Sequence, residues 1–141
     1  MIYGIGIDTV EVDRFREWQT KPIEKLRRIF SAEELDYCLY TPEKSAERFA
    51  ARFAAREALF KAYQSAAFLL THKAPSITLF GLCPYVTITK ADNGIPLCSV
   101  DWRALQEKYP NAPILHHAQI HISLSHTRET AHALIIMSSA H

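Results

Sequence analysis

Two carboxylates and one lysine are the residues of this sequence best placed to do chemistry. Asp8 follows the alternating run Gly4 to Ile7, which predicts a short strand whose glycines allow close backbone approach. A carboxylate at the exit of such a strand can reach a ligand with little obstruction, although the same position suits a helix cap. Glu57 and Lys61 are four residues apart and therefore share one face of a predicted helix. Taken alone, that pair has the spacing of an ordinary surface ion pair.

A second polar group, Ser123 to Thr127, ends a predicted strand with hydroxyls and an imidazole, which include Ser125 and His126. Such groups donate hydrogen bonds to phosphate oxygens, but the same composition also makes an ordinary turn. The three histidines between residues 116 and 121 do not indicate a metal site. No cysteine or acidic ligand accompanies them at a recognisable spacing.

Basic residues gather in one segment of a nearly neutral chain. The net charge of the 141 residues is +1, yet residues 14–28 contain six basic side chains and only two acidic ones. A local basic patch on a neutral protein argues against bulk nucleic-acid binding. It favours one acidic partner surface or a phosphate-bearing ligand, with a solvated helix face as the alternative.

Length and composition predict one ordinary globular domain over residues 1–141. The chain is 48% hydrophobic and 22% charged, which excludes a disordered or collagen-like protein. No apolar run approaches the roughly 20 residues that span a bilayer, and the N-terminus lacks the basic region of a secretory signal. We therefore expect a cytoplasmic protein with no membrane partner. Three cysteines without a Cys-x-x-Cys pair indicate reduced core residues.

Hydrophobic periodicity predicts an α+β fold with a small, mostly antiparallel sheet packed on a long central helix. Residues 43–70 contain no glycine or proline and carry apolar side chains at helical spacing, so they form the longest predicted helix. Capping-box spacings at Asp8 to Glu11 and at Ser31 to Glu34 predict helices that run to about residue 19 and about residue 40. Further helices are expected from residue 22 and over residues 102–109. Strands are expected at residues 4–8, 76–80, 85–90, 97–100, 120–125 and 131–137, with a turn at Asp92-Asn93-Gly94.

Four stretches of this sequence, in their order along the chain, carry a family resemblance. They are Gly4 to Glu11, Phe30 to Cys38, Arg48 to Ala62 and Ile122 to Thr127. Together they resemble the holo-[acyl-carrier-protein] synthases, the short single-domain branch of the 4'-phosphopantetheinyl transferases. The similarity covers most of residues 2–62 and 120–137, while the middle contributes only the turn at residues 93–96. The resemblance implies the 4'-phosphopantetheinyl transferase-like fold.

The resemblance also implies a reaction, the transfer of phosphopantetheine from coenzyme A to a serine of an apo acyl-carrier protein. Adenosine 3',5'-bisphosphate is the second product. Asp8 and Glu57 match the metal-binding acids of the family, with Mg²⁺ as the expected ion and Mn²⁺ as the alternative. Either Glu57 or a metal-bound water takes the proton from the attacking serine. Lys61 matches the lysine that faces the phosphates, and coenzyme A contacts are implied for Lys61, Ser125 and His126 and less directly for Arg52.

Family members dock acidic carrier proteins and are typically homotrimers with active sites between subunits. Arg14 matches a family position for this docking, and we extend the role to Lys21 and Arg28. The chain departs from the family pattern twice. Arg56 stands where lysine is usual, and residues 63–70 continue without the usual glycine-rich turn. A non-catalytic coenzyme A or carrier-protein binding module on the same fold is the main alternative, and an interaction domain that presents the basic segment is a third.

Overall fold

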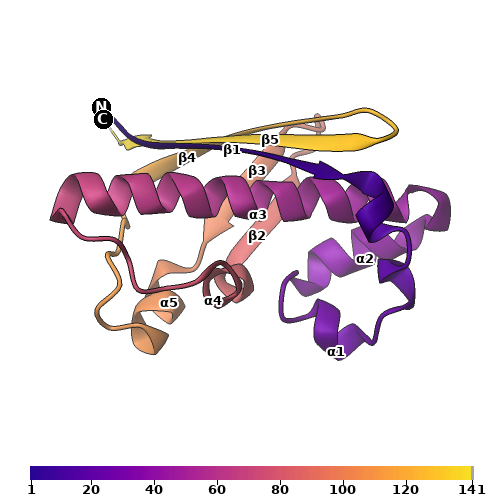
Figure 1. Ribbon diagram of the computed structural model, residues 1–141, viewed down its shortest axis with the longest axis horizontal. Helices are drawn as coiled ribbons and strands as arrows, with labels where there is room; N and C mark the ends of the chain where they lie inside the picture. The colour runs from indigo at the N-terminus through magenta and orange to yellow at the C-terminus, as the bar shows by residue number, and fades with distance from the viewer. Residues whose placement is uncertain (141) are drawn as a thin grey trace.

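One long helix, α3 (Pro42–Thr71), runs through the molecule, and the other elements pack around it (Figure 1). The computed structural model describes residues 1–140. On one side of α3 lies a three-stranded antiparallel sheet in the order β1-β5-β4, made of β1 (Ile2–Glu11), β4 (Ala118–His126) and β5 (Thr130–Ser139). Four short helices, α1 (Ile23–Leu26), α2 (Ala32–Tyr40), α4 (Leu79–Leu82) and α5 (Trp102–Lys108), lie on the opposite side. The hairpin of β2 (Val86–Lys90) and β3 (Pro96–Val100) passes beside α3, with β3 next to β4.

The first strand lies directly on the backbone of α3 because it has glycines at the contact. Gly4, Gly6 and Asp8 belong to the buried face of β1. A Cβ atom added to Gly6 would collide with the carbonyl oxygen of Ala58, and one added to Gly4 would collide with that of Ala62. Only a residue without a side chain permits this approach. The contact fixes the register between β1 and the middle of α3.

A buried ion pair ties α2 and the β2–β3 hairpin to α3. Arg56 is 1% exposed, and its two terminal nitrogens donate to the two carboxylate oxygens of Glu34 at 2.7 and 2.6 Å. One of these nitrogens also donates to the carbonyl oxygen of Val86 in β2 at 2.8 Å. Glu34 accepts from the backbone N–H of Ser31 as well, which closes the capping box at the start of α2. Arginine suits position 56 because a lysine ammonium lacks this planar, bidentate geometry.

An aromatic cluster fixes the segment that carries the basic residues. Phe15 and Trp18, from two 3-10 turns (Val12–Phe15 and Trp18–Thr20), pack against Phe53 of α3 with ring centroids 5.4 and 5.8 Å apart. Trp18 also lies 6.1 Å from Phe30 and from Phe49. Large buried aromatic side chains contribute strongly to core packing. They hold the basic segment against the first half of α3.

The α+β class expected from the sequence is confirmed, with antiparallel strands packed on one long helix. The capping box at Ser31 is present, and the predicted turn closes the β2–β3 hairpin with Gly94 at a φ of 82°. All three cysteines are free, with Cys38 and Cys83 buried. Within residues 1–140, no helix combines the length and the apolar character needed to cross a bilayer.

Two predicted elements are wrong. Residues 76–80 do not form a strand, because Thr78 caps the helical turn α4 and its hydroxyl accepts the N–H of Gly81 at 3.1 Å. Asp8 neither ends its strand nor caps a helix. Strand β1 continues to Glu11 because it pairs with β5 as far as Thr130, and 3-10 turns follow in place of the helix expected to residue 19.

The substitution Gly6→Ala tests the contact between β1 and α3. The new methyl group must displace the helix backbone at Ala58, so we expect the free energy of unfolding to fall by about 3 kcal/mol. Gly94→Ala is the control, because that position has a positive φ but open space around it and costs about 1 kcal/mol. Urea denaturation followed by circular dichroism measures both values. Equal losses would contradict the role given to the contact.

Candidate active site

Asp8 is a nearly buried carboxylate that faces α3 from β1. It is 8% exposed, and its Oδ1 accepts a hydrogen bond from Nζ of Lys61 at 2.9 Å. The same ammonium donates to the backbone carbonyl of Ile7 at 2.9 Å, so β1 holds the lysine at two points. The Oδ2 atom of Asp8 is buried and has no hydrogen-bond partner within residues 1–140. One carboxylate oxygen is therefore left for a ligand.

Glu57 lies one helical turn before Lys61 and next to Asp8. Burial, followed by the neighbouring Asp8 carboxylate, raises the pKa of Glu57 to about 7. The positive charges of Arg14 and Lys61 act in the opposite direction. Two carboxylates this close resist being ionised together, so Glu57 exchanges its proton near neutral pH. We call Asp8 and Glu57 the acidic pair.

The acidic pair has the donor set of a cation site that a substrate completes. Hard cations such as Mg²⁺ are bound through one or two carboxylates, with water and substrate phosphates as the other ligands. Asp8 offers an unpartnered buried oxygen, and Glu57 offers a second carboxylate at the same place. Across the described residues, no group of three or more histidine, cysteine, aspartate and glutamate side chains is gathered for a metal. The acidic pair therefore suits an ion that water and substrate also bind, rather than a structural metal enclosed by protein ligands.

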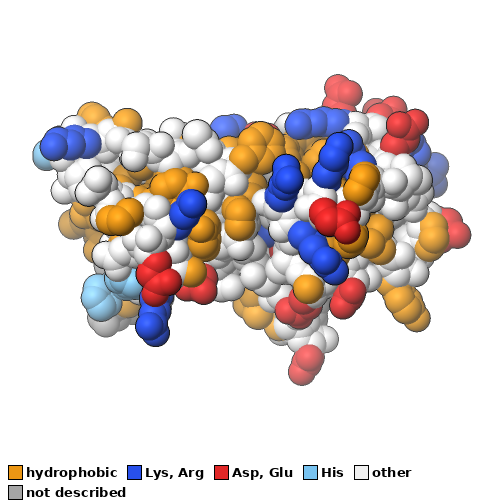
Figure 2. Space-filling view, turned by 90° about the horizontal axis from the view of Figure 1, so that it is seen from below, with side chains coloured by type: hydrophobic (Ala, Val, Ile, Leu, Met, Phe, Trp, Pro, Cys, Tyr) orange, Lys and Arg blue, Asp and Glu red, His pale blue; other side chains and the backbone are white. Residues whose placement is uncertain are grey.

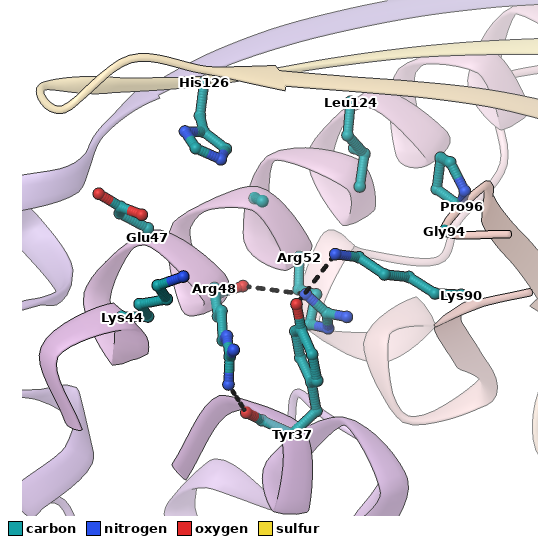
Figure 3. Close-up of a pocket in the computed structure, with 11 residues that line it drawn as sticks. Tyr37, Lys44, Glu47, Arg48, Arg52, Lys90, Gly94, Pro96, Leu124 and His126 are labelled. Atoms are coloured by element: carbon teal, nitrogen blue, oxygen red, sulfur yellow. Dashed lines mark hydrogen bonds between the residues drawn. The ribbon is translucent and has the colours of Figure 1, made fainter. Parts of the chain in front are cut away.

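A second polar site lies at the other edge of the sheet, between β4, α2, α3 and the β2–β3 hairpin (Figure 3). It is a pocket of about 340 Å³, which we call the cationic pocket. Arg52 is 4% exposed here, and its Nε donor has no partner within the described chain. An excess of cationic donors suits an anion such as phosphate. The polar side chains that line the pocket are Tyr37, Lys44, Arg48, Arg52, Lys90 and His126, with Glu47 as the carboxylate.

The structure brings the predicted site residues together in two groups. The acidic pair and Lys61 lie at the β1 edge, whereas Arg52 and His126 lie in the cationic pocket at the β4 edge. Since the strand order is β1-β5-β4, these are opposite edges of one sheet. Ser125 belongs to neither group, because side chains alternate along β4 and its own faces the exposed side of the sheet.

Arg14 lies beside the acidic pair rather than far out on the surface. Its guanidinium carbon is 4.8 Å from the centroid of the Phe53 ring, which is a favourable cation–π distance. Its positive charge also acts on the pKa of Glu57. The first residue of the basic segment is thus next to the acidic pair.

The rest of the basic segment borders a groove. Two adjoining hollows of about 250 and 510 Å³ share Lys25, Ile29 and Phe80 in their linings. Lys21 lines the smaller hollow and Arg28 the larger one. Figure 2 shows lysine and arginine side chains gathered around exposed hydrophobic surface at the end of the molecule that holds α1. This basic groove combines positive charge with an apolar floor.

Most residues of the cationic pocket are not among the site residues predicted from the sequence. Lys44 and Arg48 precede Arg52 at intervals of four residues, so one stripe of α3 carries all three. That helical spacing was a usable signal. Lys90 and Tyr37 come from β2 and α2, and nothing local in the sequence connects them to α3.

Comparisons with known proteins agree with this architecture. Residues 4–113 match a family described as the 4'-phosphopantetheinyl transferase superfamily. A holo-[acyl-carrier-protein] synthase of Treponema denticola is 33% identical over 137 residues, which cover 97% of this chain and 98% of the relative. One from Nocardia farcinica is 31% identical over 137 residues, with 96% and 87% covered. A Bacillus anthracis holo-(acyl-carrier-protein) synthase, crystallised in complex with CoA (3',5'-ADP), superposes with a TM-score of 0.69 at 25% identity, and 99% of each chain is covered.

The substitution Glu57→Gln tests the charge state of the acidic pair. The folded chain holds a proton on Glu57 up to about pH 7, whereas an unfolded chain releases it near 4.5. Stability therefore falls as the pH rises between these values, and Glu57→Gln removes that loss. In urea unfolding without divalent ions, we expect the variant to match the parent at about pH 4 and to exceed it by about 1 kcal/mol at about pH 8, after allowance for solvent screening.

Magnesium at about 10 mM is expected to raise the melting temperature of the parent protein at pH 8. Glu57→Gln and Asp8→Asn should lose this response, while Glu43→Gln, an exposed acid of the same helix, should keep it. A magnesium shift that is equal in all four proteins would contradict a cation site at the acidic pair.

Proposed function

The chain belongs to the 4'-phosphopantetheinyl transferase superfamily, and we propose that it acts as a holo-[acyl-carrier-protein] synthase. In this role it transfers the 4'-phosphopantetheine group of coenzyme A to a serine of apo acyl-carrier protein and releases adenosine 3',5'-bisphosphate. The observation that carries the proposal is the acidic pair beside Lys61, which places two carboxylates and an ammonium around one point. We place the enzyme in the cytoplasm and its reaction in fatty acid biosynthesis.

The reaction replaces the phosphoanhydride bond of the coenzyme A pyrophosphate with a phosphoester bond to serine. The serine oxygen forms a bond to the phosphorus that carries pantetheine, and the bond from that phosphorus to the bridging oxygen breaks. The bridging oxygen keeps the electron pair and leaves as part of the 5'-phosphate of adenosine 3',5'-bisphosphate. Transfers of this kind depend mainly on positioning and charge stabilisation.

Each residue of the acidic site has a part in this step. Glu57 lies where it can take the serine proton; its pKa of about 7 holds for the site without a cation, and a bound cation would lower it. Asp8 fixes the ammonium of Lys61, which lies where it can offset negative charge on the leaving phosphate. Asp8 and Glu57 would together hold Mg²⁺, whose charge, when the ion is bound, neutralises the pyrophosphate oxygens.

The cationic pocket would take a phosphate of coenzyme A. Arg52 is buried there with a donor that has no partner within the described residues, and His126 adds an imidazole from β4. Because the pocket and the acidic pair lie at opposite edges of the sheet, one coenzyme A that uses both would lie between two chains. This arrangement supports a homotrimer whose active sites are shared between neighbouring subunits.

The exposed side of the sheet supplies a surface for such an assembly. Ile5 and Ile7 are 53% and 63% exposed, and Leu134, which pairs with Ile7, is 36% exposed. Contiguous apolar surface of this kind usually marks an interface. Ser125 lies on the same side, so it would reach coenzyme A only from within the assembly. A native mass equal to that of one chain in light scattering would contradict the trimer.

The basic groove would dock the acyl-carrier protein. Arg14 leads from the groove to the acidic pair, so a carrier held by Lys21 and Arg28 would place its serine near Glu57. Opposite charges across such a surface mainly raise the rate of encounter and make it depend on salt. The exposed Phe80 offers an apolar contact in the same groove.

A non-catalytic binding module is the second candidate, and one observation favours it. Where the family has a glycine-rich turn, α3 continues to Thr71 and ends on His72 with a φ of 56°. The backbone that would face the adenosine side is therefore different. A module of this kind would bind coenzyme A and transfer nothing.

Intact mass spectrometry of an apo acyl-carrier protein decides between the two candidates. Incubation with this protein, coenzyme A and Mg²⁺ should add one phosphopantetheine group to the carrier, and a chelator should prevent it. Glu57→Gln should slow the transfer by at least about 100-fold, while Glu43→Gln should not change it. No adduct, with coenzyme A still bound in calorimetry, would contradict the synthase and support the binding module.

The substitution Arg28→Glu tests the docking surface at a distance from the acidic pair. We expect the KM for the carrier protein to rise by about tenfold or more, while the KM for coenzyme A and kcat stay unchanged. Arg14→Glu should raise the carrier KM as well, and it should also shift the pH profile because its charge acts on Glu57. Arg103→Glu, an exposed arginine of α5, is the control. Equal effects on both KM values would contradict the proposal that the basic groove docks the carrier protein.

A further inference from the structure

One tyrosine stands at the centre of the cationic pocket. The ring of Tyr37, from α2, points between the arginines of α3 (Figure 3). The guanidinium carbons of Arg48 and Arg52 lie 4.0 and 4.3 Å from the ring centroid, well inside the range of a cation–π contact. A terminal nitrogen of Arg48 also donates to the backbone carbonyl of Tyr37 at 2.7 Å. Tyr37 thus contacts both arginines.

The hydroxyl of Tyr37 reaches a third cation from a third element. Nζ of Lys90, in β2, donates to the phenolic oxygen at 2.9 Å and lies 5.1 Å from the ring centroid. Partial burial by itself raises the pKa of the phenol, but the hydrogen bond from Lys90 and the three positive charges outweigh it and lower the pKa. The tyrosine therefore lies in a strongly positive field.

Within residues 1–140 these three cations, Arg48, Arg52 and Lys90, have no ion-pair partner, although the carboxylate of Glu47 lines the same pocket. Arg52 is only 4% exposed, and its Nε has no hydrogen-bond acceptor in the described chain. Like charges held this close repel one another, and the electron-rich ring face offsets part of that repulsion. The unused N–H donors are left for an anion.

We propose that Tyr37 is a positioning residue that holds Arg48, Arg52 and Lys90 in place for the 3'-phosphate of coenzyme A. This inference rests on the proposed function. Coenzyme A carries a pyrophosphate and one phosphate monoester, and the reacting pyrophosphate belongs at the acidic pair and Lys61. The monoester is the remaining anion, and its two negative charges match a pocket whose four lysine and arginine side chains outnumber its one carboxylate, Glu47, and whose guanidinium groups are bidentate donors. Tyr37 orders these donors and leaves the phosphate contacts to them.

Two substitutions separate the ring of Tyr37 from its hydroxyl. Tyr37→Phe keeps the ring under Arg48 and Arg52 but releases Lys90, and Tyr37→Leu removes both contacts. In calorimetric titrations with coenzyme A, we expect binding to weaken about threefold to tenfold in Tyr37→Phe and about tenfold or more in Tyr37→Leu. With 3'-dephospho-coenzyme A, both variants should bind within about twofold of the parent, because the monoester is absent.

Tyr40→Phe is the matched control, since Tyr40 lies on the same helix, is 85% exposed and lines no part of the pocket. It should bind both ligands as the parent does. In turnover assays, the Tyr37 variants should raise the KM for coenzyme A with kcat unchanged. The double variant Tyr37→Phe with Lys90→Met should bind coenzyme A no more weakly than Lys90→Met alone, because the hydroxyl acts through Lys90.

Three results would overturn the proposal. Equal losses for coenzyme A and 3'-dephospho-coenzyme A would mean that Tyr37 only supports the fold. Full additivity in the double variant would mean that the hydroxyl does not act through Lys90. Equal affinity of the parent protein for the two ligands would show that the pocket does not bind the 3'-phosphate. Binding is measured without turnover, so a parent protein that transfers nothing would contradict the proposed function and leave the result on Tyr37 intact.

Discussion

The contact between β1 and the backbone of α3 is the constraint on which the acidic site depends. Gly4 and Gly6 allow the strand to lie on the helix at Ala62 and Ala58. A side chain at either glycine position would force the strand and the helix apart. Side chains alternate along a strand, so Asp8 comes next on the same face. On the helix, Glu57 precedes Ala58 and Lys61 precedes Ala62. The small residues that make the contact therefore also set the positions of the charged ones, and the site is a direct result of close packing.

A different interaction organises the cationic pocket. The ion pair of Glu34 and Arg56 joins α2, α3 and β2 at one buried point. Tyr37 follows Glu34 by one helical turn, and Lys90 lies further along the strand that begins at Val86. Burying two charges is costly, and such a pair adds orientation more reliably than it adds stability. Here the orientation is specific, because it brings Tyr37 and Lys90 from two elements to the same side of α3.

The sequence predicted the elements whose signals are local. A stretch without glycine or proline identified the long helix, Ser31 marked the start of α2, and Gly94 marked the hairpin turn. Local patterns failed where one pattern fits two structures. The alternation of apolar residues 77 and 79 resembles a strand, yet Thr78 caps a helical turn there. Family motifs identified the acidic pair and Lys61, whereas the pocket around Tyr37 depends on contacts between residues 53 positions apart, which no local pattern encodes.

The two sites share one physical principle, because each gathers like charges that the neighbouring opposite charges compensate only in part. At one edge of the sheet, burial and the neighbouring Asp8 carboxylate raise the pKa of Glu57 to about 7. At the other edge, three cations surround one phenol without an acidic partner within the described residues. Neither cluster stabilises the fold, since like charges repel and are partly withdrawn from water. The close packing on α3 maintains both clusters against that repulsion. A cation at the first cluster and a phosphate at the second would relieve this repulsion, and that relief would contribute to the binding of a substrate that brings the opposite charges.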